Sequence, residues 1–241
     1  MTTSCLADRL GRLIPLGDDE RAALIALEAR DRPLRRGATL QREHEPVADF
    51  YVLKRGMLMS YLLTGEGSRQ ILGFHFPGDL VGFANLAYRA APETIAALTE
   101  ANVAPVERQA LGRLIAARPR LAALLLADAQ VAQVALADRL AALGRRSAKA
   151  RVAGVLVDLR DRLREGGASD FALGLTQEEI GDATGLTAVH VNRMLRQLAQ
   201  EGLIAREGGR VRLLDEAALV RAAGRVDRGG ALDLGWLPPA G

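Results

Sequence analysis

The chain has 241 residues, of which 49% are hydrophobic and 25% are charged, and its formal net charge is +3. This composition excludes a disordered chain, which combines low hydrophobicity with high net charge, and the length allows one or two domains. Cys5 is the one cysteine, so an internal disulfide or a four-cysteine iron–sulfur site is excluded. No stretch reaches ~18 uninterrupted apolar residues, and the N-terminus lacks the apolar segment of a signal peptide. We therefore expect a cytoplasmic protein without a membrane span.

The first half of the chain shows two successive patterns. Residues 6–30 are predicted to form short helices, which end before Pro33. From about residue 34 to residue 107, short apolar runs such as residues 50–53 alternate with turn residues such as Pro77, Gly78 and Asp79. Strands separated by turns about every ten residues indicate an antiparallel β-sandwich or roll.

The segment 108–165 is rich in alanine and leucine and is predicted to be helical. Pro119 suits the first turn of a helix, Gly144 offers a hinge, and a further helix over residues 147–163 ends at Gly166 and Gly167. The helix after Pro119 carries two apolar stripes. A helix packed only on its own domain needs one stripe, whereas two stripes favour a homodimer helix. The predicted dimer seam is Leu126, Ala129, Gln133, Leu136, Leu140 and Leu143, and the opposite stripe is Leu124, Ala127, Val131 and Val134.

Residues 174–200 carry several local signals of a helix-turn-helix. Thr176 and Glu179 form a capping box that opens a short helix. Gly185 supplies the positive φ of a tight turn, and Thr187 caps a second helix that runs to about Gln200. Gly181 allows the two helices to cross closely. The small core predicted beneath them is Ile180, Val191, Leu195 and Leu198.

A predicted hairpin follows, with strands over residues 203–206 and 210–214 around Glu207, Gly208 and Gly209. We interpret it as the wing of a winged helix-turn-helix. Residues 188–214 hold five arginines and two glutamates, so this short segment carries the same net charge, +3, as the entire chain. A charge run alone indicates a solvated face, but basic residues clustered on a helix-turn-helix favour a phosphate-binding face.

The second helix of this motif is predicted to enter the major groove of DNA with its N-terminal residues on base edges. Arg193 can pair bidentately with guanine, and Asn192 can read adenine or hold a phosphate. The predicted base-reading residues are Ala188, Val189, Asn192 and Arg193. The predicted phosphate contacts are Thr176, Thr187, His190, Arg196, Arg206, Arg210, Arg212, Arg146 and Lys149.

This order of parts resembles the Crp/Fnr family of bacterial transcription regulators over roughly residues 15–215. Residues 73–83 (GFHFPGDLVGF) and 175–193 are the segments most similar to the family, and the first of them resembles the Fnr side. The resemblance implies an α+β fold: an N-terminal antiparallel β-roll of the cyclic-nucleotide-binding type, a long dimerisation helix and a C-terminal winged helix-turn-helix. It also implies a homodimer that binds double-stranded DNA at a pseudo-palindromic promoter site and acts with RNA polymerase. We place the domain boundaries at 1–118, 119–144 and 145–216, with a C-terminal tail at 217–241.

The effector region departs from the cyclic-AMP-binding members of that family. Those members hold the phosphate with a Glu and an Arg, whereas this chain has Phe83 at the Glu position and Glu93, followed by Thr94, at the Arg position. An acid there repels a phosphate, although a gapped loop could recruit Arg89. We therefore predict a possible effector pocket at Phe83, Arg89, Glu93 and Thr94, but not cyclic AMP.

No metal or other cofactor is predicted. The four-cysteine cluster of oxygen-sensing members cannot form with Cys5 alone. His75 is the one histidine in the apolar strands, and His44 falls in a loop. A lone histidine in an apolar strand more often fills the core than binds haem. A cupin-type metalloenzyme would need a His-x-His pair, which the chain lacks, so we predict no enzyme.

Two further expectations concern the recognition helix and the end of the chain. Many family members carry a Glu where this chain has Val189. We therefore expect a half-site related to, but different from, the Fnr-type TTGA. The missing Glu also leaves open a nonspecific, nucleoid-type DNA binder. After the wing, residues 215–225 are predicted to form a short helix, and the tail is predicted to dock through Trp236.

Overall fold

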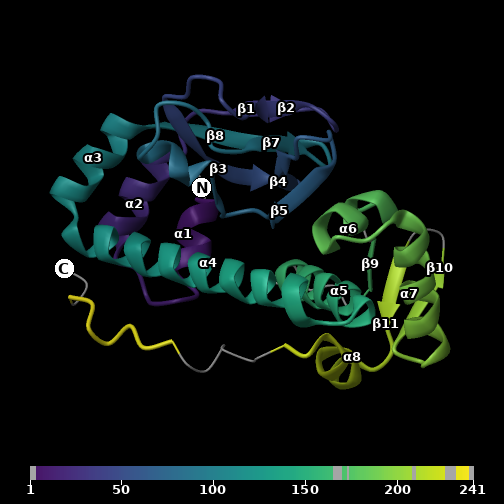
Figure 1. Cartoon of the computed structure of the whole chain (residues 1–241). Coiled ribbons are helices and arrows are strands. Elements are labelled where there is room, and N and C mark those ends of the chain that lie inside the picture. Colours follow the sequence, from purple (N-terminus) through teal and green to yellow (C-terminus); the bar gives the residue numbers. More distant parts are fainter. Residues whose placement is uncertain (1–3, 165–169, 173, 208–209, 226–231, 239–241) are drawn as a thin grey trace. The chain divides into compact units, whose positions relative to one another are not determined.

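The computed structural model describes residues 4–164, 170–172, 174–207, 210–225 and 232–238 (Figure 1). The chain divides into two compact units. We call the first, which comprises the described residues of Met1–Leu62, Leu72–Val134 and Leu232–Gly241, the roll unit. We call the second, which comprises those of Leu63–Ile71 and Ala135–Ala231, the helix-turn-helix unit. The predicted helix terminator at Gly166 and Gly167 and the wing turn at Gly208 and Gly209 lie outside the described residues.

The roll consists of two four-stranded sheets, as the turn spacing predicted. One sheet has the order β1-β8-β3-β6 and the other β2-β7-β4-β5. The central pairs, β3 with β8 and β4 with β7, are antiparallel. The strands are β1 (Arg32–Leu34), β2 (Thr39–Gln41), β3 (Asp49–Arg55), β4 (Leu58–Leu63), β5 (Arg69–His75), β6 (Leu80–Val81), β7 (Thr94–Ala97) and β8 (Ala101–Glu107).

Strand β3 is apolar on both faces because each face packs on a different core. Tyr51 and Leu53 face the interior between the sheets. Phe50 and Val52 alternate with them and join a second core, which includes residues of the helices that cover this sheet. Those helices are α1 (Cys5–Leu10), α2 (Asp18–Leu27), α3 (Arg108–Ala117) and the beginning of α4 (Pro119–Arg145).

Helix α4 begins at Pro119, as expected, but continues through Gly144 to Arg145. The predicted hinge at Gly144 is therefore wrong, because Gly144 lies inside an uninterrupted helix. Within the described ranges, α4 is the one helix long and apolar enough to cross a membrane by length and composition. Asp128 of α4 is buried and forms an ion pair with Arg9 of α1. Such a contact is typical of a helix that packs on the core of a protein.

The helix-turn-helix unit contains four further helices and a three-stranded sheet in its described part. Strand β9 was not predicted; it pairs antiparallel with β11 and extends the hairpin to the order β10-β11-β9. Asp215 caps the final helix, close to its predicted start. The elements are α5 (Ala148–Arg164), β9 (Asp170–Ala172), α6 (Gln177–Thr184), α7 (Ala188–Gln200), β10 (Ile204–Glu207), β11 (Arg210–Leu213) and α8 (Glu216–Ala223).

Candidate nucleic-acid interface

Helix α6 begins with the predicted capping box. The Thr176 hydroxyl accepts a hydrogen bond from the Glu179 backbone N–H at 3.1 Å, and the Glu179 carboxylate accepts one from the Thr176 N–H at 2.6 Å. Two backbone donors at the helix start are thereby satisfied. Thr176, a predicted phosphate contact, thus has a structural role at the N-terminus of α6.

The connection and close crossing of α6 and α7 require glycine at two positions, one in the turn and one inside α6. Gly185 ends α6 with φ +63°, a left-handed conformation that favours glycine. A Cβ on Gly181 would lie 2.4 Å from the Leu186 carbonyl oxygen, so a side chain there would collide with backbone. The close crossing predicted at Gly181 is confirmed, and it fixes the position where α7 begins.

Helix α7 divides into a buried and an exposed face. The predicted core residues Val191, Leu195 and Leu198 are fully buried, and Met194, which was not predicted, joins them. On the other face, Val189 is 81% exposed, and Arg193 and Arg196 are exposed as well. The exposed residues recur with the period of the helix, so the N-terminal half of α7 presents one continuous surface to solvent.

The start of α7 also orients a histidine. The Thr187 hydroxyl accepts a hydrogen bond from the His190 N–H at 3.3 Å, and the His190 Nδ1 lies 3.1 Å from the same oxygen. His190 is therefore held beside the helix cap. The free backbone N–H groups and the positive dipole end of a helix N-terminus attract an anion. The position of His190 therefore agrees with the prediction that it contacts a phosphate and not a base.

The wing places arginines on one face of its hairpin. Val211 of β11 is fully buried, while Arg210 and Arg212 on either side of it are exposed. On β10, the Arg206 guanidinium donates a hydrogen bond to the Asn192 side-chain oxygen of α7 at 3.3 Å. The hairpin and α7 thus meet through Arg206 and Asn192, two of the predicted DNA-contacting side chains.

Two predicted phosphate contacts upstream of the motif have partners within the unit. Lys149 of α5 forms an ion pair with Glu201 at 2.8 Å, and this hydrogen bond lowers the pKa of the Glu201 carboxyl. Arg146 donates to the Ala223 carbonyl oxygen at 2.9 Å. Arg151, which was not predicted as a contact, donates to the Thr184 carbonyl oxygen at 2.6 Å and so ties α5 to the end of α6.

Comparison with known proteins agrees with both units. Residues 31–118 match the family model of the cyclic nucleotide-binding domain, and residues 150–222 match that of the Crp-like helix-turn-helix domain. The chain is 30% identical over 225 residues to the transcriptional activator protein FnrA of Stutzerimonas stutzeri, covering 91% of this chain and 89% of the relative.

It is 28% identical to the fumarate and nitrate reduction regulatory protein of Escherichia coli K12, covering 92% and 90% of the two chains. Among solved structures, FixK2 from Bradyrhizobium japonicum is similar with a TM-score of 0.75 and 28% identity, over 82% of this chain and 98% of that one. The chain belongs to the Crp/Fnr family. It is a transcription regulator with a helix-turn-helix DNA-binding domain, and the predicted fold class and general function are confirmed.

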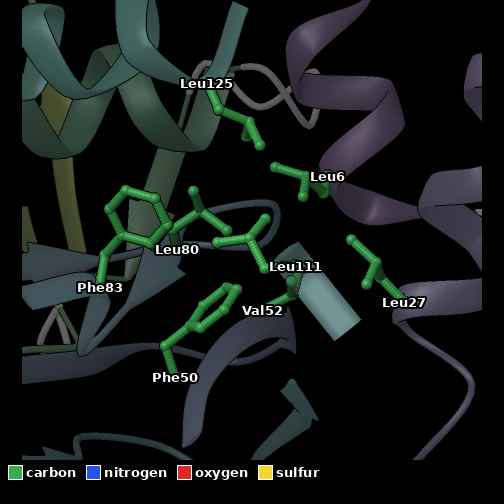
Figure 2. A pocket seen from close by; sticks show the side chains of 8 residues that line it. All are labelled: Leu6, Leu27, Phe50, Val52, Leu80, Phe83, Leu111 and Leu125. Carbon is green, nitrogen blue, oxygen red and sulfur yellow. The ribbon is translucent and has the colours of Figure 1, made fainter. Parts of the chain in front are cut away.

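In this Crp/Fnr protein, Phe83 is part of an apolar core. It begins a short 3₁₀ helix, η1 (Phe83–Leu86), and its ring meets that of Phe50 edge-on at 5.3 Å between centroids. Phe83 lines a pocket that has no room for a water molecule (Figure 2). The pocket's lining is Leu6, Leu27, Phe50, Val52, Leu80, Phe83, Leu111 and Leu125, and Arg89, Glu93 and Thr94 are not among these residues.

The other three predicted effector residues have separate surroundings. Arg89 is exposed. Burial raises the pKa of Glu93, while a hydrogen bond from Ser60 opposes this shift. The Thr94 hydroxyl accepts from the Glu43 backbone N–H at 3.0 Å. The structure thus joins Glu93 and Thr94 to the polar interior of the roll and places Phe83 in an apolar core.

A buried amide cluster in the same region was missed by sequence reasoning. Asn85 is fully buried and donates to the Gln41 side-chain oxygen and to the Asp49 carbonyl oxygen, both at 2.8 Å. Gln41 in turn donates to the Glu93 carbonyl oxygen at 3.2 Å. These hydrogen bonds join residues more than thirty positions apart in the chain, so no local sequence pattern predicts them. They hold the segment around Glu93 in place.

Proposed function

We propose that this protein binds a pseudo-palindromic promoter site as a homodimer, with the N-terminal half of α7 in the major groove. The observation that carries this proposal is the exposed face of α7. The side chains of Arg193 and Arg196, together with that of Arg212 of the wing, have no hydrogen-bond or ion-pair partner among the described residues. Cations left without intramolecular partners on a helix-turn-helix are available to DNA phosphates and bases.

Base reading is assigned to Ala188, Val189, Asn192 and Arg193. Arg193 reads guanine through its two parallel donors, while Ala188 and Val189 offer only apolar contact, which suits a thymine methyl group. Arg206 occupies the Asn192 oxygen in the free protein, so the Asn192 amide N–H groups remain to donate to a base acceptor. Phosphate contacts are assigned to Thr187, His190, Arg196, Arg210 and Arg212. Arg146 and Lys149 contact phosphates only by exchanging their present partners.

The dimer is proposed to form along α4. On the predicted seam, Leu126 is 59% exposed, Leu136 52% and Leu140 71%. Val134, which was assigned to the opposite stripe, is exposed too. An apolar row on a long helix is stabilised when it is covered, and a second α4 with the same spacing covers it. Sedimentation at increasing protein concentration tests this proposal: Leu140→Asp should shift the equilibrium to the monomer. The dimerisation segment is then 119–144, between a sensor domain at 1–118 and a DNA-binding domain at 145–216.

No cofactor is proposed for the roll. The negative charge at Glu93 disfavours a cyclic nucleotide phosphate, and Cys5 is the sole cysteine of the sequence, so a four-cysteine cluster has no ligands. His75 lies on β5 and is proposed to be a core residue rather than a haem ligand. The protein is proposed to act in the cytoplasm with RNA polymerase, as a regulator and not as an enzyme.

A nonspecific DNA binder is the second candidate, because exposed Val189 offers no hydrogen bond to a base. Selection of binding sites from random duplex DNA at two salt concentrations separates the two. An enriched palindrome supports the regulator. Binding without enrichment, with affinity that falls uniformly as salt rises, supports the nonspecific binder.

A further inference from the structure

The C-terminal segment Leu232–Pro238, which follows the helix-turn-helix unit in the chain, packs on the roll unit. Leu237 is only 7% exposed and lies in the apolar core that also contains Leu24 of α2 and Leu121 of α4. Leu234 packs against the same core. Figure 1 shows this end of the chain beside the beginning of α4. Trp236 is 59% exposed, so the predicted docking through Trp236 is wrong: Leu237 is the residue that inserts.

A hydrogen bond from Arg120 to Pro238 fixes the position of the segment on this core. The Arg120 guanidinium donates to the Pro238 carbonyl oxygen at 2.6 Å, to the Glu20 carboxylate at 2.6 Å and to the Pro15 carbonyl oxygen at 3.1 Å. Arg120 and Glu20 are both buried. A buried guanidinium needs acceptors for its donors, and the segment supplies one of them.

The segment is also ordered by its own backbone. The Leu237 N–H donates to the Leu234 carbonyl oxygen at 3.1 Å, and the Gly235 N–H donates to the Asp233 carboxylate at 2.9 Å. These turns bring Leu234 and Leu237 to the same core while Trp236 stays outside. The segment therefore has an apolar insert, a polar anchor and a defined turn, which together make a specific docking site.

The connection from the last helix to this segment is short. Helix α8 ends at Ala223, and residues 224–231 lead to Leu232. A chain of this length spans at most roughly 30 Å. Because the connection is short, docking of the segment is intramolecular, and the effective concentration of the segment at its binding surface is in the millimolar range. Weak contacts are therefore enough to keep the segment docked. The chain thus leaves the roll unit along α4 and returns to it at Leu232, so that residues 135–231 are connected to the roll unit at both ends.

We propose that the Leu232–Pro238 segment is an intramolecular anchor that restrains the helix-turn-helix unit and thereby raises its affinity for DNA. The physical reason is preorganisation. The anchor already reduces the conformational entropy of the helix-turn-helix unit in the free protein, so less entropy is lost when DNA binds. This inference rests on the proposed DNA-binding function. It assigns the helical face around Arg120 as a receptor surface whose occupant is the end of the same chain.

Trp236 provides the measurement, because it is the one tryptophan of the chain. Its fluorescence anisotropy reports whether the segment tumbles with the protein or freely. Leu237→Asp should undock the segment and lower the anisotropy. Leu232→Asp is the matched control: Leu232 is 49% exposed, so the same charge enters the same segment without entering the core. The affinity for a selected duplex should fall at least about fivefold in Leu237→Asp and stay unchanged in Leu232→Asp.

A second variant separates the restraint from the stability of the roll. About twenty Gly and Ser residues inserted after Arg225 lengthen the connection but leave every docking contact intact. The anisotropy should then remain near that of the parent while the DNA affinity falls toward that of Leu237→Asp. This variant decides the question even if Leu237→Asp does not fold.

Several outcomes overturn the anchor. They are an unchanged or higher DNA affinity in both the undocked and the lengthened variant, a parent anisotropy already equal to that of a free peptide, and docking lost on dilution to monomers, which would place the segment on a second copy. Failure of all proteins, the parent included, to bind DNA would instead contradict the proposed function, and the anisotropy would still decide whether the segment docks.

Discussion

In the roll unit, buried Arg120 and partly buried Arg9 are held by carboxylates. Arg120 pairs with Glu20 at 2.6 Å, and Arg9 pairs with Asp128 at 2.8 Å and with Asp79 at 3.2 Å. In the helix-turn-helix unit, Arg193 and Arg196 on the exposed face of α7 meet no partner among the residues that the structure describes. The same residue type therefore serves two purposes. Paired and buried, it fixes the architecture; unpaired and exposed, it leaves its donors for a ligand.

The difference separates charge that stabilises the fold from charge that binds. Net charge alone does not make this distinction, since acidic and basic residues nearly balance over the chain. What distinguishes the exposed face of α7 is that the side chains of Arg193 and Arg196 meet no acid among the described residues. Four pairs of variants test this comparison and the scaffold on which it depends.

The largest effect is expected from Arg120→Met. It leaves the buried Glu20 carboxylate and two carbonyl oxygens without their donor, so the free energy of unfolding should fall by about 3–5 kcal/mol. Denaturant unfolding followed by Trp236 fluorescence reports on this unit. Arg118→Met is the matched control, because its pair with Asp19 is exposed on both sides and should contribute at most about 1 kcal/mol. Equal losses in the two variants would refute the distinction between buried and exposed pairs.

Arg193→Ala should weaken binding to the selected DNA site by about 1–3 kcal/mol, which is about fivefold to 150-fold, and relax the preference at one base position. Arg196→Ala is the comparison variant on the same helix face. It should lower the affinity for all sequences alike and reduce the slope of log K against log salt by about one. Both are measured by titration of labelled duplexes at several salt concentrations. An unchanged base preference in Arg193→Ala would remove Arg193 from the reading set.

Local patterns predicted the helix-turn-helix well because its signals lie within a few residues of one another. Thr176 and Glu179 are three apart, and Gly185 needs only its own φ. The roll's strands were likewise visible in apolar runs and turns. What escaped prediction depends on contacts distant in the chain: the Asn85–Gln41 amide pair and the Arg120–Pro238 bond join elements that no spacing rule connects. The tail was predicted to dock through Trp236, whereas the backbone turn directs Leu237 into the core.

Gly181→Ala should disturb the scaffold that aims α7. The added Cβ meets the Leu186 carbonyl oxygen, which belongs to backbone and yields little, so the helix-turn-helix unit should lose about 1–3 kcal/mol of stability. Gly154→Ala in α5 is the counterpart with nothing within 4 Å of the new atom, and it should gain up to about 1 kcal/mol from helix propensity. Thermal unfolding followed by circular dichroism measures both. A stabilising Gly181→Ala would mean that the two helices do not cross as closely as the structure shows.

The smallest effect concerns Glu93, a partly buried acid near the polar interior of the roll. Burial raises the pKa of the Glu93 carboxyl above its ordinary value of 4.5, so folding shifts this group toward its protonated form relative to the unfolded chain. Stability therefore declines as the pH rises from that value through the raised pKa, and it recovers on acidification. Glu93→Gln, which is neutral at every pH, should match the parent near pH 4 and exceed its stability at neutral pH, as measured by denaturant unfolding at both. Ser60→Ala removes the hydrogen bond that opposes the shift and should widen the gap between the two pH values. A Glu93→Gln variant that is less stable than the parent at neutral pH would show instead that the roll uses the ionised carboxylate, and the contrast between paired and unpaired charge would then extend into the interior of the roll.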